Sequence, residues 1–481
     1  MSISRNTFLK SFFWKFFEKS SAQIAQFVIG IILARLLMPE DYGAISMLTV
    51  FIVISQVIIN GGFNTALVQK KGADNTDFST VFYFSMGIAL VIYVILYICA
   101  PFIADFYAMP ELISPLRVLS LVLFFNTINS IQRAYVSKKM LFKKLFYCSL
   151  LATILSGSIG IYLAYNGFGI WALVAQALSH AMFTTAIMWF SVKWRPIWAF
   201  SKQSFRQLFE FGWKILTTNI ITQLFMNIRR LIIGKYYSPA DLAYYDRGDH
   251  MPSLVTSTFF ESFQTVLFPV LSDDQNEKDV VKSRMRRSTK FNCFIIYPLM
   301  VGLIVTAKPL IVLLLTEKWI GVVPFMQILC IANFFRPITI SNAEAIKALG
   351  YSDITLKLEI IKKIIDMTIL IIRATIGVMA IAWGCVLYNF ICLFINLYPN
   401  IKLLNYSIVE QIKDATPTLL ISLLMGAIVY FVQLLPIPNI AILTLQVLLG
   451  GLLYAFFCKI FKEESFMYTL SMIKEFRNKR K

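Results

Sequence analysis

The sequence contains few charged residues for its length. Of its 481 residues only 15% are charged, whereas 58% are hydrophobic and the mean hydropathy is +0.70. Soluble domains carry about 25% charged residues, so the composition excludes an ordinary soluble globular protein. The apolar runs reach about 20 residues, long enough for a helix to cross the hydrocarbon core, and they lack the short alternation of an outer-membrane barrel. The composition therefore predicts an all-α integral membrane protein.

Clustered histidine and cysteine residues are also absent. The chain has two histidines, and its seven cysteines are dispersed through apolar segments without a Cys-x-x-Cys pair. Zinc sites and disulfide frameworks need ligands or cysteines at characteristic short spacings. We therefore expect no metal site and no cofactor, other than a coupling H+ or Na+ in the case of an ion-driven transporter.

Long connections on the outer side of the membrane are missing too. We predict fourteen spans at about residues 12–35, 42–69, 78–104, 113–137, 145–165, 168–192, 207–234, 240–271, 288–315, 320–346, 354–375, 378–401, 409–434 and 438–461. Basic connections, such as the one with Lys70 and Lys71, alternate with acidic or uncharged ones. The positive-inside rule then places both termini in the cytoplasm and accounts for the net charge of +19. No outer connection could fold into a catalytic domain.

The longest polar connection is residues 272–290, on the cytoplasmic side. It mixes acidic residues with Lys282, Arg284, Arg286 and Arg287. We interpret it as a solvated linker, because the two signs of charge are interspersed.

A motif recurs after about 200 residues. A cation, a proline and an aspartate keep the same offsets: Arg35, Pro39 and Asp41 in the first copy, and Lys235, Pro239 and Asp241 in the second. Each copy lies between two apolar runs and predicts a proline-marked turn between two membrane helices. Because six spans fill each repeat, the halves should be parallel repeats around a central cavity. We predict six-helix bundles over 1–200 and 201–405, helices thirteen and fourteen over 406–465, and a basic cytoplasmic tail over 466–481.

Several predicted spans carry polar residues at helical spacing, which places them on one face of the helix. These stripes include Lys19, Gln23 and Gln26; Gln56, Asn60 and Asn64; Asn126, Asn129 and Arg133; Asn219, Gln223, Asn227 and Arg230; and Asp246 and Asp249. An ionised side chain at the bilayer centre costs about 2.5–3.5 kcal/mol, so lipid cannot surround them. Two interpretations remain open: a hydrated cavity, or hydrogen bonds between helices with cations reaching toward the membrane surface.

Two further features concern motion and ion coupling. Pro337 in the tenth predicted span removes a backbone donor and predicts a bend there. Acidic residues at membrane depth are candidates for binding a coupling ion: Asp249, Glu261, Glu344 and Asp366. Each could instead be neutralised by a neighbouring cation, as Lys362 or Lys363 could do for Asp366.

Six short motifs carry a family resemblance over nearly the whole chain. They occupy residues 34–43, 167–174, 244–247, 267–272, 317–319 and 348–350. Through them the chain resembles the Wzx-type polysaccharide flippases of the multidrug/oligosaccharidyl-lipid/polysaccharide exporter superfamily. The resemblance implies two six-helix bundles and two additional helices, in agreement with the predicted spans.

The motif that ends at Arg247 is also similar to lipid II flippases, in which the matching arginine is assigned to the substrate diphosphate. The resemblance implies the same role for Arg247. Those relatives have further arginines in the first two helices, whereas here the first offers Lys15 and Lys19 and the second has no cation in its interior. We hypothesise that the diphosphate is bound by Arg247, Lys19, Lys214 and Arg230, and that sugar is contacted by Gln23, Gln26, Gln56, Asn60, Asn219, Gln223 and Asn227.

The function implied by the resemblance is a flippase without enzymatic activity, in the bacterial cytoplasmic membrane. It would move undecaprenyl-diphosphate-linked oligosaccharide units to the outer leaflet by alternating access, for O-antigen, capsule or exopolysaccharide synthesis. Expected partners are that lipid-linked substrate, the bilayer, a polysaccharide polymerase and glycosyltransferases, and no nucleic acid. Three alternatives stay open: a cation-coupled multidrug exporter, which predicts an acid-rich cavity; a membrane glycosyltransferase or polymer ligase; and a membrane scaffold without transport activity.

Overall fold

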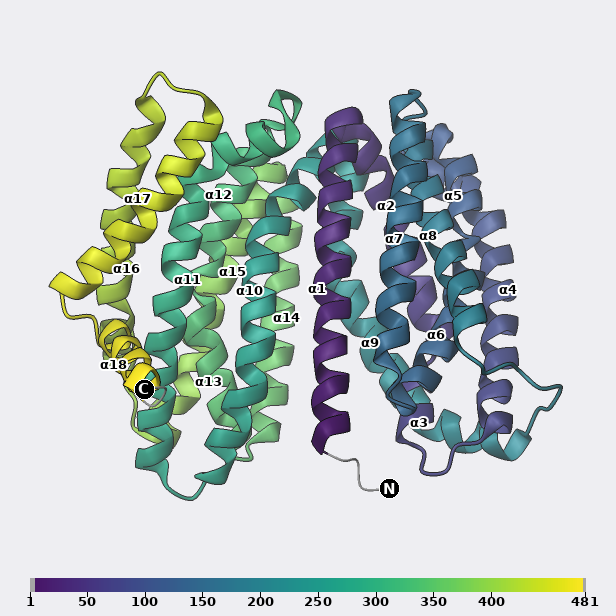
Figure 1. The fold of residues 1–481 in the computed structure, drawn as a ribbon, viewed down its shortest axis with the longest axis horizontal. Coiled ribbons are helices and arrows are strands. Elements are labelled where there is room, and N and C mark those ends of the chain that lie inside the picture. Colours follow the sequence, from purple (N-terminus) through teal and green to yellow (C-terminus); the bar gives the residue numbers. More distant parts are fainter. Residues whose placement is uncertain (1–4, 479–481) are drawn as a thin grey trace. The chain divides into compact units, whose positions relative to one another are not determined.

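The computed structural model describes residues 5–478, with side chains described for residues 21–471 and 475. Within this range the chain forms α-helices and three short 3-10 helices, and no strand occurs among the described residues (Figure 1). The prediction of an all-α protein is therefore confirmed.

Eleven helical segments in the described part are long and apolar enough to cross a membrane. They are Pro39–Gln69, Asn75–Phe106, Pro110–Lys138, Phe142–Tyr165, Ile170–Ser191, Pro239–Asp273, Lys278–Leu315, Val322–Ala348, Val378–Leu404, Ile408–Leu434 and Asn439–Ile460. This supports a multi-pass membrane protein.

The other three predicted spans coincide with helices that are long but more polar. These are α1 (Arg5–Leu36), α9 (Lys202–Tyr236) and α14 (Ser352–Ala374). In α1 only Ser21–Leu36 forms an apolar stretch. Each of these helices carries several charged residues, so apolar length alone does not identify it as a span. The count of fourteen spans stays a prediction.

The chain forms two units, Met1–Ala243 and Tyr244–Lys481, which meet within α10 (Pro239–Asp273). Unit 1 includes α9, because this helix packs on α2 (Pro39–Asn60), α3 (Phe63–Gln69) and α4 (Asn75–Phe106). The predicted repeat limits of 1–200 and 201–405, the parallel repeats and the central cavity stay predictions.

Within unit 1, α7 (Phe142–Tyr165) packs on α1 and on α8 (Ile170–Ser191). The segment between α8 and α9 is held against α4 by aromatic and polar contacts. Trp194 is 3% exposed and packs against Phe78 and Phe82 of α4, with ring centroids 6.0 and 6.1 Å away. The backbone N–H groups of Ile197 and Ser201 donate to hydroxyl groups of α4. Unit 1 therefore has an aromatic core where α4 begins.

The repeated motifs form the two predicted turns, because α2 begins at Pro39 and α10 begins at Pro239. In each turn the aspartate accepts a hydrogen bond from the backbone N–H before the proline: Asp41 from Met38 at 3.1 Å, and Asp241 from Ser238 at 3.3 Å. A carboxylate in the first turn is also favoured by the helix dipole. The prediction of two proline-marked turns is confirmed.

The two turns also pack directly on each other within unit 1. Gly43 follows Asp41 by two residues, and a Cβ atom built on it would lie 1.7 Å from the carbonyl oxygen of Pro239. Only a residue without a side chain permits such a close backbone approach.

Three of the membrane segments are interrupted. Pro39–Gln69 divides into α2 and α3 at Gly61 and Gly62, which both have positive φ angles. Pro110–Lys138 contains a break between α5 (Ile113–Leu119) and α6 (Val122–Lys138), and Val322–Ala348 divides into α12 (Val322–Asn333) and α13 (Arg336–Ala348). Pro337 lies in the first turn of α13, so the predicted bend is confirmed.

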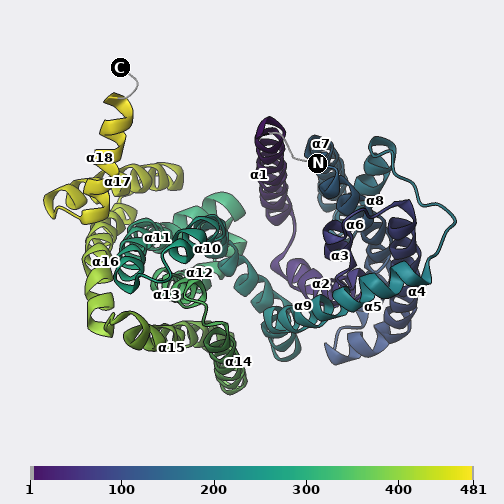
Figure 2. The same cartoon turned by 90° about the horizontal axis from the view of Figure 1, so that it is seen from below.

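Unit 2 is arranged around α11 (Lys278–Leu315), as Figure 2 shows. This helix packs on α12, α13, α16 (Ile408–Tyr430) and α17 (Asn439–Ile460). On the other side of α12 and α13 lies α15 (Val378–Leu404), which also packs on α14. The C-terminal helix α18 (Glu464–Asn478) packs on α11 and α17.

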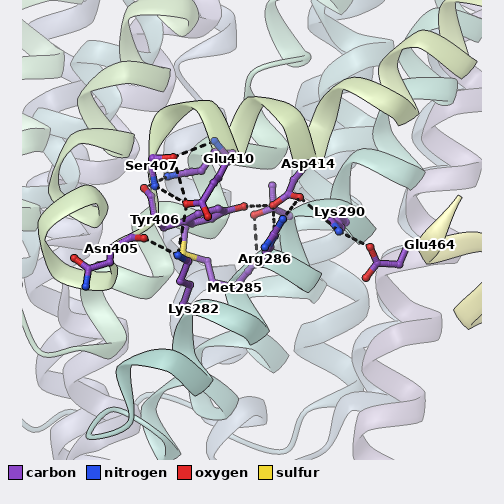
Figure 3. A network of polar contacts seen from close by, with 12 residues as sticks. Lys282, Met285, Arg286, Lys290, Asn405, Tyr406, Ser407, Glu410, Asp414 and Glu464 are labelled. Carbon is purple, nitrogen blue, oxygen red and sulfur yellow. Dashed lines mark hydrogen bonds and ion pairs between the residues drawn. The ribbon is translucent and has the colours of Figure 1, made fainter.

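A polar network joins the beginning of α11 to α16 and α18 (Figure 3). The Asp414 side chain, only 4% exposed, accepts two hydrogen bonds from Arg286, at 2.5 and 2.9 Å. It accepts a third from the Tyr406 hydroxyl group at 2.6 Å. Burial, together with the bond to Asp414, raises the pKa of Tyr406, so this hydroxyl group stays protonated and donates. Lys290 lies 3.5 Å from Asp414 and also pairs with Glu464.

The interpretation of residues 272–290 as a solvated linker is wrong in its extent. Only residues 274–277 lie between α10 and α11. All four cations named for this segment, Lys282, Arg284, Arg286 and Arg287, lie in α11. Arg284 pairs with Asp274 at 2.5 Å, and Lys282 donates to the Asn405 carbonyl oxygen at 2.6 Å. Two of its cations bind partners far away in the sequence, Lys282 at Asn405 and Arg286 at Asp414, which the sequence alone does not reveal.

Candidate functional site

A pocket of about 980 Å³ lies within unit 1, where α2, α3, α6, α8 and α9 meet. Most of the residues that line it are of polar type: Gln56, Asn60, Asn64, Thr65, Val68, Gln69, Asn126, Asn129, Ser130, Arg133, Ala134, Ser137, His180, Ala181, Thr184 and Phe211. The volume is at the upper end of the ~300–1,000 Å³ typical of small-molecule sites. A polar pocket of this size in an apolar protein is the best candidate site in the described part of the chain.

One wall of the pocket is a polar stripe on α6. Asn126, Asn129 or Ser130, Arg133 and Ser137 follow one another at intervals of three or four residues, so they share one helix face. Arg133 is exposed and makes no hydrogen bond or ion pair with any residue described in the structure. It supplies the only permanent charge among the described lining residues, which include no carboxylate.

A second wall comes from the interrupted second segment. Gln56 and Asn60 end α2, and the Gln56 side-chain amide donates to the Asn60 oxygen at 3.3 Å. The chain then turns at Gly61 and Gly62 and continues with Asn64 in α3. The break brings side chains of both helices to the same pocket. It also lets Gly62 approach the Gly212 carbonyl oxygen of α9, which an added Cβ atom would meet at 2.4 Å.

The third wall is formed by α8 and contains one of the two histidines. The His180 Nε2 atom lies 3.4 Å from the Thr153 hydroxyl group of α7, so the ring is oriented by a neighbouring helix. Thr184 donates back to the His180 carbonyl oxygen at 2.7 Å, as hydroxyl groups within helices often do.

Two acceptor atoms of the pocket residues have no partner among the described residues. They are the Gln56 Oε1 and Asn129 Oδ1 atoms, and Asn129 is only 5% exposed. A buried acceptor without a hydrogen bond costs about 1–3 kcal/mol. Both atoms are themselves buried, so this cost concerns the packing around the pocket.

The predicted sugar-contacting residues lie in three places. Gln56 and Asn60 line the pocket, whereas Gln23 and Gln26 are exposed on α1 and Asn219 is exposed on α9. Further along α9, the Asn227 amide donates to Gln223 at 3.2 Å and its oxygen accepts from Arg230 at 3.1 Å. These hydrogen bonds lie within α9, whereas the alternative to a cavity predicted hydrogen bonds between helices.

The predicted diphosphate-binding cations also occupy different parts of the chain. Arg247 lies in unit 2, with its guanidinium carbon 5.9 Å from the ring centroid of buried Trp319. Lys214 and Arg230 lie in unit 1, and their sixteen-residue separation places them about 24 Å apart along α9. Lys19 belongs to α1, but its side chain is outside the described residues. Their common role stays a prediction.

The candidate acids for ion coupling differ in their surroundings. Glu344 is 4% exposed, lies 2.8 Å from Lys347 and accepts from Gln264 at 3.3 Å. Asp249 accepts from Ser253 at 3.0 Å. Asp366 is 5% exposed on α14, and Glu261 is exposed on α10. The pairing of Glu344 with a cation corresponds to the alternative predicted for these acids, in which a neighbour neutralises the charge.

Sequence reasoning did not select Arg133, Asn126 and His180 as site residues. The first two were recognised as a polar stripe, and their spacing was the signal that could have identified them. His180 gave no such signal, since a lone histidine in an apolar run has many structural explanations.

Comparisons with known proteins find relatives of this chain by sequence and by fold. Residues 32–324 match the family model described as a polysaccharide biosynthesis protein. The chain is 25% identical over 307 residues to the teichuronic acid biosynthesis protein TuaB of Bacillus subtilis, covering 63% of each chain. It is 23% identical to the succinoglycan biosynthesis transport protein ExoT of Rhizobium meliloti, over 87% of this chain and 83% of that protein. The chain thus spans just under two thirds of TuaB and most of ExoT.

Two solved structures share the fold. The lipid II flippase MurJ in an inward closed conformation superposes with a TM-score of 0.72 at 16% identity, over 95% of this chain and 99% of that one. An inward-facing multidrug resistance transporter of the MATE family, in the MOP superfamily, gives a TM-score of 0.60 at 16% identity. The match covers 79% of this chain and 94% of that one. At these identities the likeness concerns the fold alone.

Proposed function

The chain belongs to the polysaccharide biosynthesis protein family, and from this premise we propose that it is a flippase for lipid-linked oligosaccharides. The observation that carries the proposal is the polar pocket of unit 1, because it offers amides, hydroxyl groups and one cation inside a chain built of apolar helices. The relatives named for polysaccharide biosynthesis and transport support the same class of substrate.

The physical task of a flippase explains why such a pocket is needed. A glycan diphosphate cannot enter hydrocarbon, since even one ionised group at the bilayer centre costs about 2.5–3.5 kcal/mol. A protein that binds the sugars through amides and the phosphates through cations replaces their water contacts. The polyprenyl tail can remain in lipid throughout, so no covalent step is required.

The substrate that we propose is undecaprenyl-diphosphate-linked oligosaccharide, moved from the cytoplasmic to the outer leaflet with both termini in the cytoplasm. Transport occurs by alternating access, in which the substrate site opens to each side of the membrane in turn. We retain Arg247, Lys19, Lys214 and Arg230 as the cations proposed for the diphosphate. The pocket of unit 1 then receives part of the glycan, and a coupling H+ or Na+ binds one of Asp249, Glu261 and Asp366.

The second candidate is a cation-coupled multidrug exporter, which the fold likeness to the MATE family transporter favours. A site for cationic drugs requires carboxylates, whereas the described lining of the unit 1 pocket contains a cation and no acid. We therefore place the flippase first.

Deletion of the gene tests the proposal in the bacterium that carries it. We expect surface polysaccharide to be lost and lipid-linked oligosaccharide to accumulate, with both restored by a plasmid copy. The variant Arg247→Ala should restore much less polymer than wild type at equal protein level, because the substrate diphosphate would lose a charge-assisted contact. Normal polymer in the deletion strain, accompanied by increased drug susceptibility, would support the multidrug exporter instead.

A further inference from the structure

We infer that the unit 1 pocket is the subsite for an acidic sugar, whose carboxylate pairs with Arg133. This inference rests on the proposed flippase function and specifies the class of glycan that the pocket accepts.

The charge of the pocket is suited to one negative group. Arg133 is the single permanent charge in the described lining, and no residue of the described chain forms an ion pair with it. A planar guanidinium group binds a carboxylate through two parallel hydrogen bonds. Because no acid in the lining competes for Arg133, an anionic ligand can occupy that position.

The rest of the α6 and α3 walls is suited to a polyol. The side-chain amides of Asn64 and Asn126 are half-buried and make no hydrogen bond to other described residues. Asn126 lies seven residues before Arg133, so the two side chains lie on the same face of α6, two turns apart. Each amide can both donate to and accept from sugar hydroxyl groups while Arg133 holds the carboxylate.

Helix α13 of unit 2 contains a cation that is neutralised by an acid of the same helix. Both α6 and α13 follow a break in their membrane segment, and each is followed by a residue with positive φ, Met140 or Gly350. Of the two cations of α13, Arg336 donates to Thr256 and Asn333, and Lys347 lies 2.8 Å from Glu344 one turn earlier. Asn129 and Ser130 lie one turn before Arg133, and neither carries a charge. Arg133 on α6 therefore has no acid one turn before it, whereas Lys347 on α13 has one; the two cations do not occupy matched positions, because Arg133 lies seven residues before Met140 and Lys347 three before Gly350.

A carboxylate fits this pocket better than a diphosphate does. A diphosphate carries more than one negative charge and is best matched by several cations, whereas the described lining supplies one. The surrounding amides and hydroxyl groups are uncharged and match the hydroxyl groups of the same sugar ring.

Binding to the purified full-length protein in detergent tests the inference. The probes are the disaccharide cellobiouronic acid, its neutral counterpart cellobiose, and inorganic pyrophosphate, each followed by titration calorimetry. We expect wild type to bind cellobiouronic acid about tenfold more tightly than cellobiose, the ratio expected for one charge-assisted contact. The variant Arg133→Gln should bind both equally, and Arg133→Lys should retain part of the preference.

The matched control is Arg117→Gln. Arg117 lies on α5, outside the pocket. Its guanidinium carbon is 4.2 Å from the centroid of the Tyr97 ring. This variant should keep the wild-type preference. The inference is overturned if wild type shows no preference, if Arg133→Gln keeps it while folded, or if pyrophosphate binds more tightly than cellobiouronic acid. Flipping of neutral glycans without a preference for acidic sugars would refute this inference alone, and acidic-sugar binding without any flipping would refute the proposed function alone.

Discussion

Replacing Gly43 with alanine is expected to destabilise unit 1 severely. The new Cβ atom would lie 1.7 Å from the Pro239 carbonyl oxygen and 2.3 Å from its carbonyl carbon, both of which are backbone atoms. No side-chain rotation relieves this contact, so α2 and the beginning of α10 must move apart. Overpacking of a well-packed site costs about 1–3 kcal/mol, and a backbone contact belongs at the upper end of that range. The measurement is the apparent melting temperature of the purified protein in detergent, at one fixed heating rate.

Gly87→Ala is the matched control for Gly43→Ala. Gly87 is also a helical glycine of unit 1, but a Cβ atom there would meet no other atom within 4 Å. Alanine has a higher helix propensity than glycine by about 1 kcal/mol, so this variant should melt at or slightly above the wild-type temperature. Equal losses for both variants, or no loss for Gly43→Ala, would show that the two proline-marked turns do not pack as described.

Replacing Asp414 with alanine should cause the largest loss of stability in unit 2. The change leaves the Tyr406 hydroxyl group, which is fully buried, and the Arg286 guanidinium group without their acceptor. Removing one partner of a buried ion pair costs about 3–5 kcal/mol, and exposed pairs contribute about 0–1 kcal/mol. Because Arg286 is 41% exposed, water partly compensates it, and we expect a loss of about 2–3 kcal/mol. Thermal unfolding under the same conditions measures it.

Two further variants separate the contributions at Asp414. Asp414→Asn keeps an acceptor for Tyr406 but removes the charge, so its loss should be intermediate. Glu464→Ala removes the other acid that pairs with Lys290, but Glu464 is 70% exposed, and its loss should be small. If Glu464→Ala were as destabilising as Asp414→Ala, the network would owe its stability to surface charge instead of to the buried carboxylate.

The sequence allowed much of the fold to be predicted because its signals are local. The turns at Pro39 and Pro239 are specified by proline and aspartate within three residues, and the break before Pro337 follows from the chemistry of proline. The break at Gly61 and Gly62 was not predicted, although two adjacent glycines are a local signal. The break between α5 and α6 has no comparable signal, since residues 120 and 121 are serine and leucine with helical angles.

The candidate site and the polar network depend on contacts that sequence spacing does not reveal. Arg286 and Asp414 are 128 residues apart, so the basic segment near residue 280 looked like a linker. The pocket joins α6 to α3 and to α8 at residues such as Arg133, Asn64 and His180, whose proximity is created by packing. Polar stripes predict which helix faces avoid lipid, but an amide can also be satisfied by bonding within its own helix, as Asn227 is.

Flipping by purified protein is the most direct test of the proposed function. Lipid-linked oligosaccharide extracted from the native bacterium would be reconstituted in liposomes with or without the full-length protein, and a membrane-impermeant glycan-oxidising reagent would be added outside. We predict that the protein makes the inner-leaflet substrate accessible to the reagent, at a rate that rises with the amount of protein. If the inner-leaflet fraction stays protected to the same extent as in protein-free liposomes, the chain is not a flippase for that substrate.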